Sequence, residues 1–285
     1  HPPGLRSAGS ELKILDHLPT GYAVVGIVME PLSVLRQTCE KRFRQFMIRV
    51  ELIRRRGFYS IEVHTHLLSR RRIKIIGSGR THIISPPPRA VAILSKRPIE
   101  EVGSHAFAQL DHARHVAARL ENGVTIHNFY VPAGGDEPDR EKNIKFGQKL
   151  DYLTDMRDWA HAEKPEKSIL VGDLNIAPRE DDVWNHKQLL KVVSHTPIEV
   201  EHLAEAQEAG KWVDITRQDI PEGNLYSWWS YRSPDWDAAD KGRRLDHIWA
   251  TPDISNAGHS SRVLRHVRGW EKPSDHAPVF ATFDL

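Results

Sequence analysis

Asp173 and Asn175 form a pair whose types and spacing could do chemistry. They follow the apolar run 168–171 directly, in the sequence Gly-Asp-Leu-Asn. Side chains two positions apart in an extended segment point the same way, so a carboxylate and a carboxamide would lie side by side. Such a pair could hold a water, a phosphate oxygen or a hard cation. The alternative interpretation is an Asx turn that closes a strand.

A second acidic group stands beside a histidine near the end of the chain. Asp275 and His276 lie in the sequence Ser-Asp-His-Ala-Pro, just before the last apolar run. A carboxylate next to an imidazole could supply a metal ligand and a partner for a proton or a phosphate. The alternative is a turn in which the histidine is satisfied locally.

Two further residues stand at the ends of apolar runs. Asp246 opens the run 245–250 and could orient a histidine, as carboxylates do in acid–base pairs; the alternative is a salt bridge to Arg243 or Arg244. Tyr130 lies near the end of the run 124–131. Its phenol could donate to a phosphate, although a tyrosine in a strand also serves for packing.

Trp228 and Trp229 belong to a dense aromatic cluster. The sequence 226–232 is YSWWSYR, which holds four aromatic residues within six positions. Such a cluster could line a pocket for a flipped-out nucleotide or sugar, and the alternative is packing in the core. On a strand the two tryptophans would face opposite ways, so we expect at least one of them near the surface.

These residues require an ordered set of strands and helices to bring them together. Apolar runs and helical spacing alternate along the chain after residue 90, which predicts an α/β architecture. The expected strands are 91–95, 124–131, 168–171, 245–250 and 279–284, and the expected helix is 142–161.

Composition narrows the class of protein. The chain has 285 residues, of which 39% are hydrophobic and 27% charged, and this excludes collagen-like, low-complexity and mainly disordered chains. Its single cysteine excludes a disulfide framework and a multi-cysteine zinc site. It holds no run of 18 apolar residues and no signal-peptide pattern at its start, so we expect no membrane span and a cytoplasmic location.

The net charge of +2 conceals two unlike segments. Residues 1–90 carry 16 Lys and Arg against 6 Asp and Glu, whereas residues 91–285 carry 24 against 32. All eight tryptophans lie after residue 90. We therefore divide the chain into an atypical basic segment, 1–89, and a second domain, 90–285, that is incomplete alone.

The basic segment reads poorly as a folded unit. The stretches 22–29 and 60–68 predict strands, but the apolar positions of 44–56 fit neither a helical stripe nor a strand alternation. Its arginine runs would suit a nucleic-acid-binding arm. The alternative is a solvated or unfolded basic stretch.

Taken together, the motifs resemble the exonuclease III family of abasic-site endonucleases, within the endonuclease/exonuclease/phosphatase superfamily. The resemblance covers about residues 90–285. The aromatic motif and the last motif favour the DNA-repair branch over the lipid hydrolases of the superfamily. The matching stretches are VAILSK (91–96), NFYVPAGG (128–135), GDLNIAP (172–178), DDVW (181–184), YSWWSYR (226–232), RLDHI (244–248) and WEKPSDHAP (270–278).

The resemblance implies a two-sheet α/β sandwich flanked by helices, of the DNase I type. It also implies Mg²⁺-assisted cleavage 5′ to abasic sites and 3′-to-5′ removal of nucleotides from duplex DNA. In this reading Asp173 activates the water or protonates the leaving oxygen, while Asn175 and Tyr130 hold the phosphate. His276, oriented by Asp246, contacts a phosphate oxygen.

The same resemblance implies the metal and DNA contacts. Mg²⁺, or Mn²⁺ in its place, would lie at Asp275 together with Asp173 and Asn175. Trp228, Trp229 and Arg232 would contact the DNA. The expected partner is double-stranded DNA with abasic sites or 3′ ends, bound by a monomer.

Residues 1–90 depart from the family pattern. They contain neither the Trp-Asn pair nor the Gln-Glu pair whose glutamate is the principal metal ligand, and Glu30 and Glu62 are the nearest substitutes. The segment could be divergent, an unrelated fusion, or an out-of-frame reading of the gene. We therefore expect weak or absent nuclease activity and poor solubility. A phosphodiesterase or phosphatase on a non-DNA substrate, or a non-catalytic DNA-binding remnant, are the alternative functions.

Overall fold

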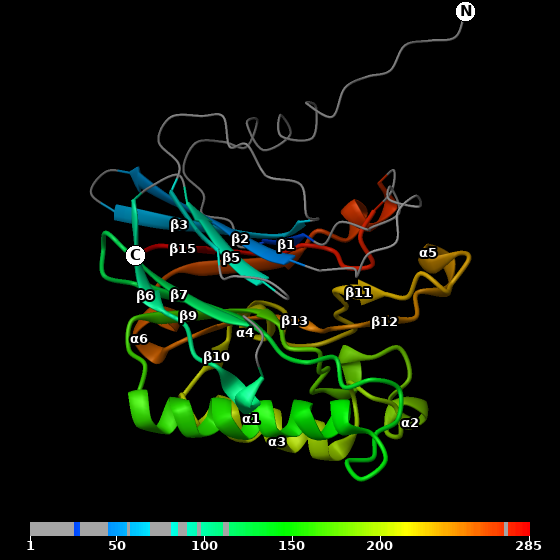
Figure 1. The fold of residues 1–285 in the computed structure, drawn as a ribbon. Helices are drawn as coiled ribbons and strands as arrows, with labels where there is room; N and C mark the ends of the chain where they lie inside the picture. The colour runs from blue at the N-terminus through cyan, green and yellow to red at the C-terminus, as the bar shows by residue number, and fades with distance from the viewer. Residues whose placement is uncertain are drawn as a thin grey trace, which may run out of the picture.

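The computed structural model describes residues 26–28, 45–55, 58–68, 81–84, 90–95, 98–110, 114–270 and 273–285. In these parts of the chain, two β-sheets lie face to face and helices cover the outer side of the second sheet (Figure 1). The predicted two-sheet α/β architecture is confirmed. No helix within the described ranges is both long enough and apolar enough to cross a membrane.

The first sheet contains strands from both halves of the divided chain. Its order is β1-β3-β2-β5-β4. The bounds are Gly26–Val28 (β1), Gln45–Arg55 (β2), Phe58–Leu68 (β3), Thr81–Ile84 (β4) and Ala90–Ser95 (β5). β5 is hydrogen-bonded to β2 on one side and β4 on the other, so segments 1–89 and 90–285 share one sheet.

The first segment, which reads poorly as a folded unit from its sequence, contributes strands to this sheet in its described parts. The stretch 44–56, which seemed to fit no regular element, contains the long strand β2. Every second residue from Phe46 to Leu52 is apolar, which is the alternation of a strand. Met47, between two of them, and Ile53, after Leu52, are apolar as well and obscure the alternation. The expected poor solubility supposes a sheet without its early strands, whereas the described residues place β1 to β4 there.

The other two strand predictions for this segment hold in part. The stretch 22–29 contains β1 and the stretch 60–68 lies within β3. β2 and β3 pair antiparallel over their whole length, with Val50 opposite Val63. The shorter β1 runs parallel to β3, with Gly26 opposite His64.

The second sheet has the order β10-β13-β9-β8-β7-β6. Sheet two carries apolar side chains on both faces, because one face packs on sheet one and the other on α1 and α3. The bounds are Ile99–Gly103 (β6), His115–Leu120 (β7), Thr125–Tyr130 (β8), Ser168–Asp173 (β9), Val213–Asp214 (β10) and Asp246–Ala250 (β13).

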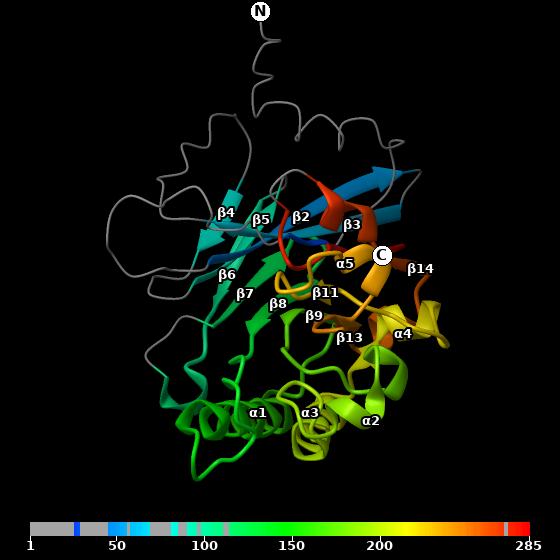
Figure 2. The same ribbon diagram turned by 90° about the vertical axis from the view of Figure 1, so that its right-hand side faces the viewer.

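Alternate residues of β9 show how this sheet is covered. Ile169 and Val171 belong to the core between the two sheets, and Leu170 belongs to the core between sheet two and the helices. This double burial explains why the strand reads as a continuous apolar run. Figures 1 and 2 show α1 and α3 side by side below sheet two.

Shorter elements complete the fold. The β14–β15 pair lies beside β1 and β3, and β11 pairs with β12 next to the end of β13. The strands are Trp228–Trp229 (β11), Gly242–Arg243 (β12), His259–Val263 (β14) and Val279–Phe283 (β15). The helices are Ile144–Glu163 (α1), His186–Leu189 (α2), Pro197–Ala209 (α3), Ile215–Asp219 (α4), Trp236–Ala239 (α5) and Pro252–Ser255 (α6), with 3₁₀ turns at Phe107–Gln109, Glu180–Asp182 and Arg265–Gly269.

The two long helices begin at clear capping residues. Asn143 caps α1 by accepting a hydrogen bond from the Lys145 backbone N–H. α3 begins with a capping box of Thr196 and Glu199, and Pro197 occupies its first turn. Both helices therefore start at fixed points near the loops that follow β8 and β9.

Candidate active site

Strand register aligns three of the predicted site residues. β8 and β9 run parallel with Tyr130 opposite Asp173, and β9 and β13 run antiparallel with Asp173 opposite Asp246. The three residues therefore form a row across adjacent strands at one edge of sheet two. Tyr130 is 8% exposed, and the Arg114 guanidinium lies 4.7 Å from the centre of its ring.

His276 reaches this row from the loop before β15. Its Nδ1 lies 2.7 Å from Oδ2 of Asp246, and both side chains are buried. Burial alone would lower the pKa of His276, but the Asp246 carboxylate, assisted by Asp173 and Asp275, raises this pKa to about 9. The imidazole is therefore a cation at neutral pH. Neither alternative partner of Asp246 takes the place of His276. Arg244 pairs with Asp182 and Asp214, and Arg243 donates to the Val193 carbonyl and to Oγ of Ser194.

Asn175 lies against Asp173 in a tight turn. Its backbone N–H donates to Oδ1 of Asp173 at 3.0 Å, and its Nδ2 donates to Oδ2 at 2.9 Å and to the Val131 carbonyl at 3.0 Å. Its φ of +55° is left-handed, a conformation that asparagine adopts more readily than other non-glycine residues. The predicted Asx turn and the predicted polar pair are thus the same structure.

Asp173 sits in a low-polarity site. Burial raises its pKa to about 7; the His276 cation opposes this rise and the Asp246 carboxylate adds to it. A carboxyl group that titrates near neutral pH can both take up and release a proton there. Gly172 allows this placement, because its φ is +148° and a Cβ there would lie 1.9 Å from the Phe129 carbonyl oxygen.

The donors at the row fit a hard cation. The carboxylate oxygens of Asp173 and Asp246 lie within 4.8 Å of each other and of a ring nitrogen of His276. His276 as a cation has no lone pair to offer, so the two carboxylates are the candidate ligands. Oδ1 of Asp246 is buried and has no hydrogen-bond partner among the described residues. Two buried carboxylates with an oxygen left over are the kind of ligands that Mg²⁺ and related cations prefer.

The other predicted metal ligands are placed differently. Asp275 is outside that cluster of three, and its Oδ2 accepts a hydrogen bond from Nε1 of Trp228 at 3.0 Å. Glu30 lies outside the described residues. Glu62 lies in β3, with its backbone opposite that of Glu51.

The predicted DNA-contacting residues divide into buried and accessible ones. Trp229 is 2% exposed and packs with Tyr226 and Ala277, so the core-packing alternative describes its ring. Trp228 is half-buried and pairs with His276 in an isolated β-bridge, while Arg232 is exposed. Trp228 therefore borders the row directly.

Two residues at the site were missed by the sequence reasoning. Lys149 and Glu199 are fully buried, and Lys149 donates to the backbone carbonyl of Asn175 at 2.8 Å. The available signal was position, because Lys149 lies three residues after Phe146 and four before Leu153, on the apolar face of the helix. A lysine at such a position is expected to be paired.

Comparison with known proteins places the site in a family. The model of the endonuclease/exonuclease/phosphatase family matches residues 49–276, starting within β2 and thus well before the resemblance expected from about residue 90. The chain is 28% identical over 168 residues to exodeoxyribonuclease III of Haemophilus influenzae, covering 56% of this chain and 61% of that protein. It is 34% identical over 199 residues to an exodeoxyribonuclease of Bacillus subtilis, covering 66% and 71%.

Solved structures agree with these relatives. An AP endonuclease from Archaeoglobus fulgidus superposes with a TM-score of 0.67 at 26% identity. A 3′ phosphatase from Neisseria, bound to a product DNA hairpin, superposes with a TM-score of 0.65 at 28% identity. Each comparison covers 73% of this chain and 80% of the other.

Proposed function

Because this chain belongs to the endonuclease/exonuclease/phosphatase family, we propose that it is a metal-dependent nuclease of DNA repair. The reaction is hydrolysis of the phosphodiester 5′ to an abasic site, with 3′-to-5′ removal of nucleotides from duplex DNA. The observation that carries the proposal is the row of Tyr130, Asp173 and Asp246, closed by the Asp246–His276 hydrogen bond. The names of the similar proteins support DNA as the substrate.

The proton transfer is assigned to Asp173. Hydrolysis of a phosphodiester needs a group that activates the attacking water or protonates the leaving oxygen. Asp173 suits either role, since burial holds its pKa near 7. Its two hydrogen bonds from Asn175 fix the orientation of the carboxyl group.

The phosphate contacts are assigned to three donors. Negative charge develops on the non-bridging oxygens, and preorganised donors stabilise it. His276 serves as a cation because Asp246 holds its proton at neutral pH. Asn175 and Tyr130 border the same edge, and we assign the carboxamide and the phenol to the phosphate. Both N–H groups of the carboxamide donate to Asp173 and Val131 here, so Asn175 must exchange one of these bonds to donate to the phosphate.

The family is metal-dependent, and we propose Mg²⁺, with Mn²⁺ as a substitute. The ion would be held by Asp173, with Asn175 and Asp275 beside it, and Asp246 offers the additional buried oxygen. When bound it would supply Lewis-acid stabilisation of the phosphate charge. Since no Gln-Glu pair occurs in residues 1–90, we expect weak Mg²⁺ binding and a slow reaction unless Glu30 or Glu62 supplies the missing carboxylate.

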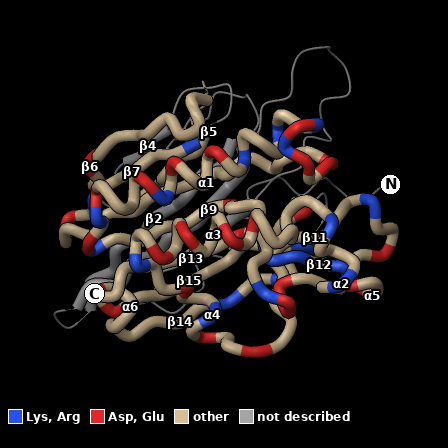
Figure 3. The backbone as a smooth tube through the Cα atoms, turned by 90° about the horizontal axis from the view of Figure 1, so that it is seen from below, with Lys and Arg blue, Asp and Glu red and all other residues tan. Residues whose placement is uncertain are grey.

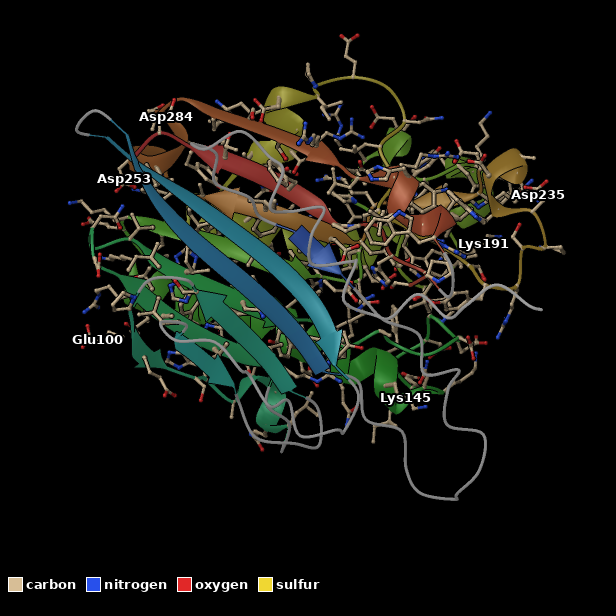
Figure 4. The ribbon with its side chains drawn as sticks, turned by 90° about the horizontal axis from the view of Figure 1, so that it is seen from above. Glu100, Lys145, Lys191, Asp235, Asp253 and Asp284 are labelled. Carbon is tan, nitrogen blue, oxygen red and sulfur yellow. The ribbon has the colours of Figure 1, made fainter. Side chains whose placement is uncertain are left out.

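The surface near the row supports an approach by DNA. Arg243 lies in β12 and Lys241 directly precedes this strand, while Lys187 lies in α2. Figure 3 shows basic residues around β12 and α2. Exposed Lys145 and Lys191 stand at this end of the molecule together with Asp235, whereas Glu100, Asp253 and Asp284 mark the opposite end (Figure 4). Local basic patches attract the DNA backbone whatever the net charge.

Trp228 and Arg232 complete the proposed DNA contact. Trp228 borders His276 through the β-bridge, and Arg232 follows on the same exposed loop. Trp229 would shape the site through packing and not through direct contact, because its own ring is buried. We further propose that the protein acts as a monomer in the cytoplasm.

A substrate panel tests this proposal. The panel contains an abasic-site duplex, a duplex with a recessed 3′ end, a duplex with a 3′ phosphate, and a small phosphodiester, each assayed with Mg²⁺ and with EDTA. Cleavage of the abasic duplex that requires Mg²⁺ supports the proposal. Turnover of the small phosphodiester alone would favour the non-DNA alternative, and binding without turnover would favour a DNA-binding remnant.

A further inference from the structure

We propose that Lys149 is a positioning residue: its buried ammonium group ties the loop after β8 to the loop after β9 and thereby sets the place of Asn175 and Asp173. This inference rests on the proposed function, because it concerns the residues to which the reaction is assigned. Lys149 itself touches neither substrate nor reacting atoms in this account.

The ammonium group of Lys149 has three acceptors around it. Its Nζ lies 2.8 Å from the carbonyl oxygen of Asn175, 2.5 Å from Oε1 of Glu199 and 3.4 Å from the carbonyl oxygen of Ala133. A lysine has three N–H donors, so each acceptor can take one. Ala133 lies three residues after Tyr130, which means that one group connects the two loops that carry the site.

Glu199 fixes the ammonium group in turn. Its carboxylate accepts hydrogen bonds from the backbone N–H groups of Ser194 and Thr196, and from Oγ1 of Thr196 at 2.6 Å. Glu199 is also the third residue of α3, where its side chain completes the capping box with Thr196. The position of Lys149 is therefore set by α3 as well as by α1, and both side chains are 0% exposed.

The carbonyl of Asn175 is the part of the turn that no other described contact anchors. The N–H of Asn175 donates to Asp173, and its carboxamide donates to Asp173 and Val131. The left-handed φ of +55° persists only where the surroundings hold it. The bond from Lys149 fixes the peptide plane that follows Asn175, and through the turn it fixes the Asp173 carboxyl.

Pairing of the two helices does not require this buried ion pair. On the surface, Arg157 of α1 donates to Glu205 of α3 at 3.0 Å, and apolar residues of both helices share one core. Buried ion pairs often contribute little to stability compared with apolar residues of similar volume. The charge at Lys149 is explained instead by the two carbonyl groups that it binds.

The test compares two kinds of double variant: one removes the buried Lys149–Glu199 pair, and the other removes the Arg157–Glu205 pair. Lys149→Met/Glu199→Gln removes the ammonium group without leaving a buried carboxylate, and glutamine keeps the capping box. The milder Lys149→Gln/Glu199→Gln carries the same comparison if the first variant does not fold. The matched control is Arg157→Met/Glu205→Gln, which breaks the exposed pair between the same helices.

Two readouts are measured on the full chain. Hydrogen exchange of the backbone amides of 173–177 follows the turn without any need for activity, and the amides of α1 and α3 report on the helices. The second readout is kcat and KM on an abasic-site duplex with saturating Mg²⁺, expressed per folded molecule.

In the Lys149 variants we expect the amides of 173–177 to exchange about tenfold faster or more while α1 and α3 remain protected. We expect kcat to fall about 10- to 100-fold with KM changed by less than about threefold. The control should match the wild type in both readouts. Unchanged exchange of the amides of 173–177, or faster exchange in the helices to the same degree, would overturn the proposal. A wild-type chain without turnover would instead count against the proposed function, and the exchange result would still decide the role of Lys149.

Discussion

Asp246 lies opposite Asp173 in the β13–β9 register, and the two carboxyl groups are buried beside the same imidazole. Two acids that share a low-polarity site cannot both ionise easily without a cation nearby. His276 supplies one positive charge through its bond to Asp246. The protonation states of Asp173, Asp246 and His276 therefore depend on one another.

Asp246→Asn keeps the shape of the side chain and removes its charge. The Asp246 carboxylate raises the pKa of His276 to about 9, so the variant imidazole should lose its proton nearer pH 6.5. Activity that needs the cation should then decline at a lower pH on the alkaline side. We expect kcat at pH 8 to fall about 100-fold, as measured by pH–rate profiles of both proteins. An alkaline limb at the same pH in both proteins would contradict the assignment of His276.

Asp173→Asn should abolish most activity and yet stabilise the metal-free fold. The folded pKa of about 7 lies above the unfolded value of 3.8, so the native carboxyl holds its proton longer than the unfolded chain does. The stability of the wild type therefore falls as pH rises from about 4 to 7, and the amide variant escapes this loss. In EDTA at pH 8 we expect a Tm higher by a few degrees, with the difference vanishing at pH 4. A lower Tm at pH 8 would mean that Asp173 is not strained by burial.

Acid should destabilise the fold through buried histidines away from the site. Nε2 of His115 lies 3.2 Å from Nδ1 of His127. Burial lowers the pKa of His127 to about 3 and that of His115 well below 6.5. Between pH 6.5 and these lower pKa values the unfolded chain binds more protons than the folded chain, so the free energy of unfolding declines as pH falls below 6.5. His127→Gln should reduce the loss between pH 6.5 and 4 by up to about 3 kcal/mol, as measured by urea unfolding. An equal pH dependence in the two proteins would exclude this pair as the cause.

Gly172→Ala should destabilise the fold more than a glycine-to-alanine substitution in a turn where the added Cβ meets no other atom. The new Cβ would lie 1.9 Å from the Phe129 carbonyl oxygen, so β8 and β9 would have to separate where Tyr130 meets Asp173. We expect a loss of about 3 kcal/mol or more in urea unfolding. Gly223→Ala is the control, because its φ of +82° is strained but no atom lies within 4 Å of the added Cβ. Its expected cost is about 1 kcal/mol, and equal losses at both positions would refute the steric argument.

The sequence predicts well those elements whose residues follow one clear period. β9 and β13 are apolar runs that end or begin at polar residues, and α1 lies within two residues of its predicted bounds. The predicted pairing of Asp246 with a histidine came from the motifs and not from spacing, because 30 residues separate it from His276. What each of these residues does in a reaction stays a prediction.

Other features were hidden by composition. β2 was missed because Met47 and Ile53 break the alternation of its apolar residues, and a basic stretch without a clear stripe resembles a solvated one. Lys149 was missed because a lysine in a helix is read as exposed unless its partner is known, and Glu199 lies 50 residues away. Such pairs depend on the packing of α1 against α3, which no local pattern encodes.

The central claim is that the row of Tyr130, Asp173 and Asp246 is a metal-dependent nuclease site. The most direct measurement is single-turnover cleavage of an abasic-site duplex by the wild type and by Asp173→Asn, each with rising Mg²⁺ and with EDTA. We predict cleavage 5′ to the abasic site by the wild type only, increasing up to high Mg²⁺ and absent in EDTA. Cleavage that persists in EDTA, or that Asp173→Asn performs at the wild-type rate, would contradict the claim.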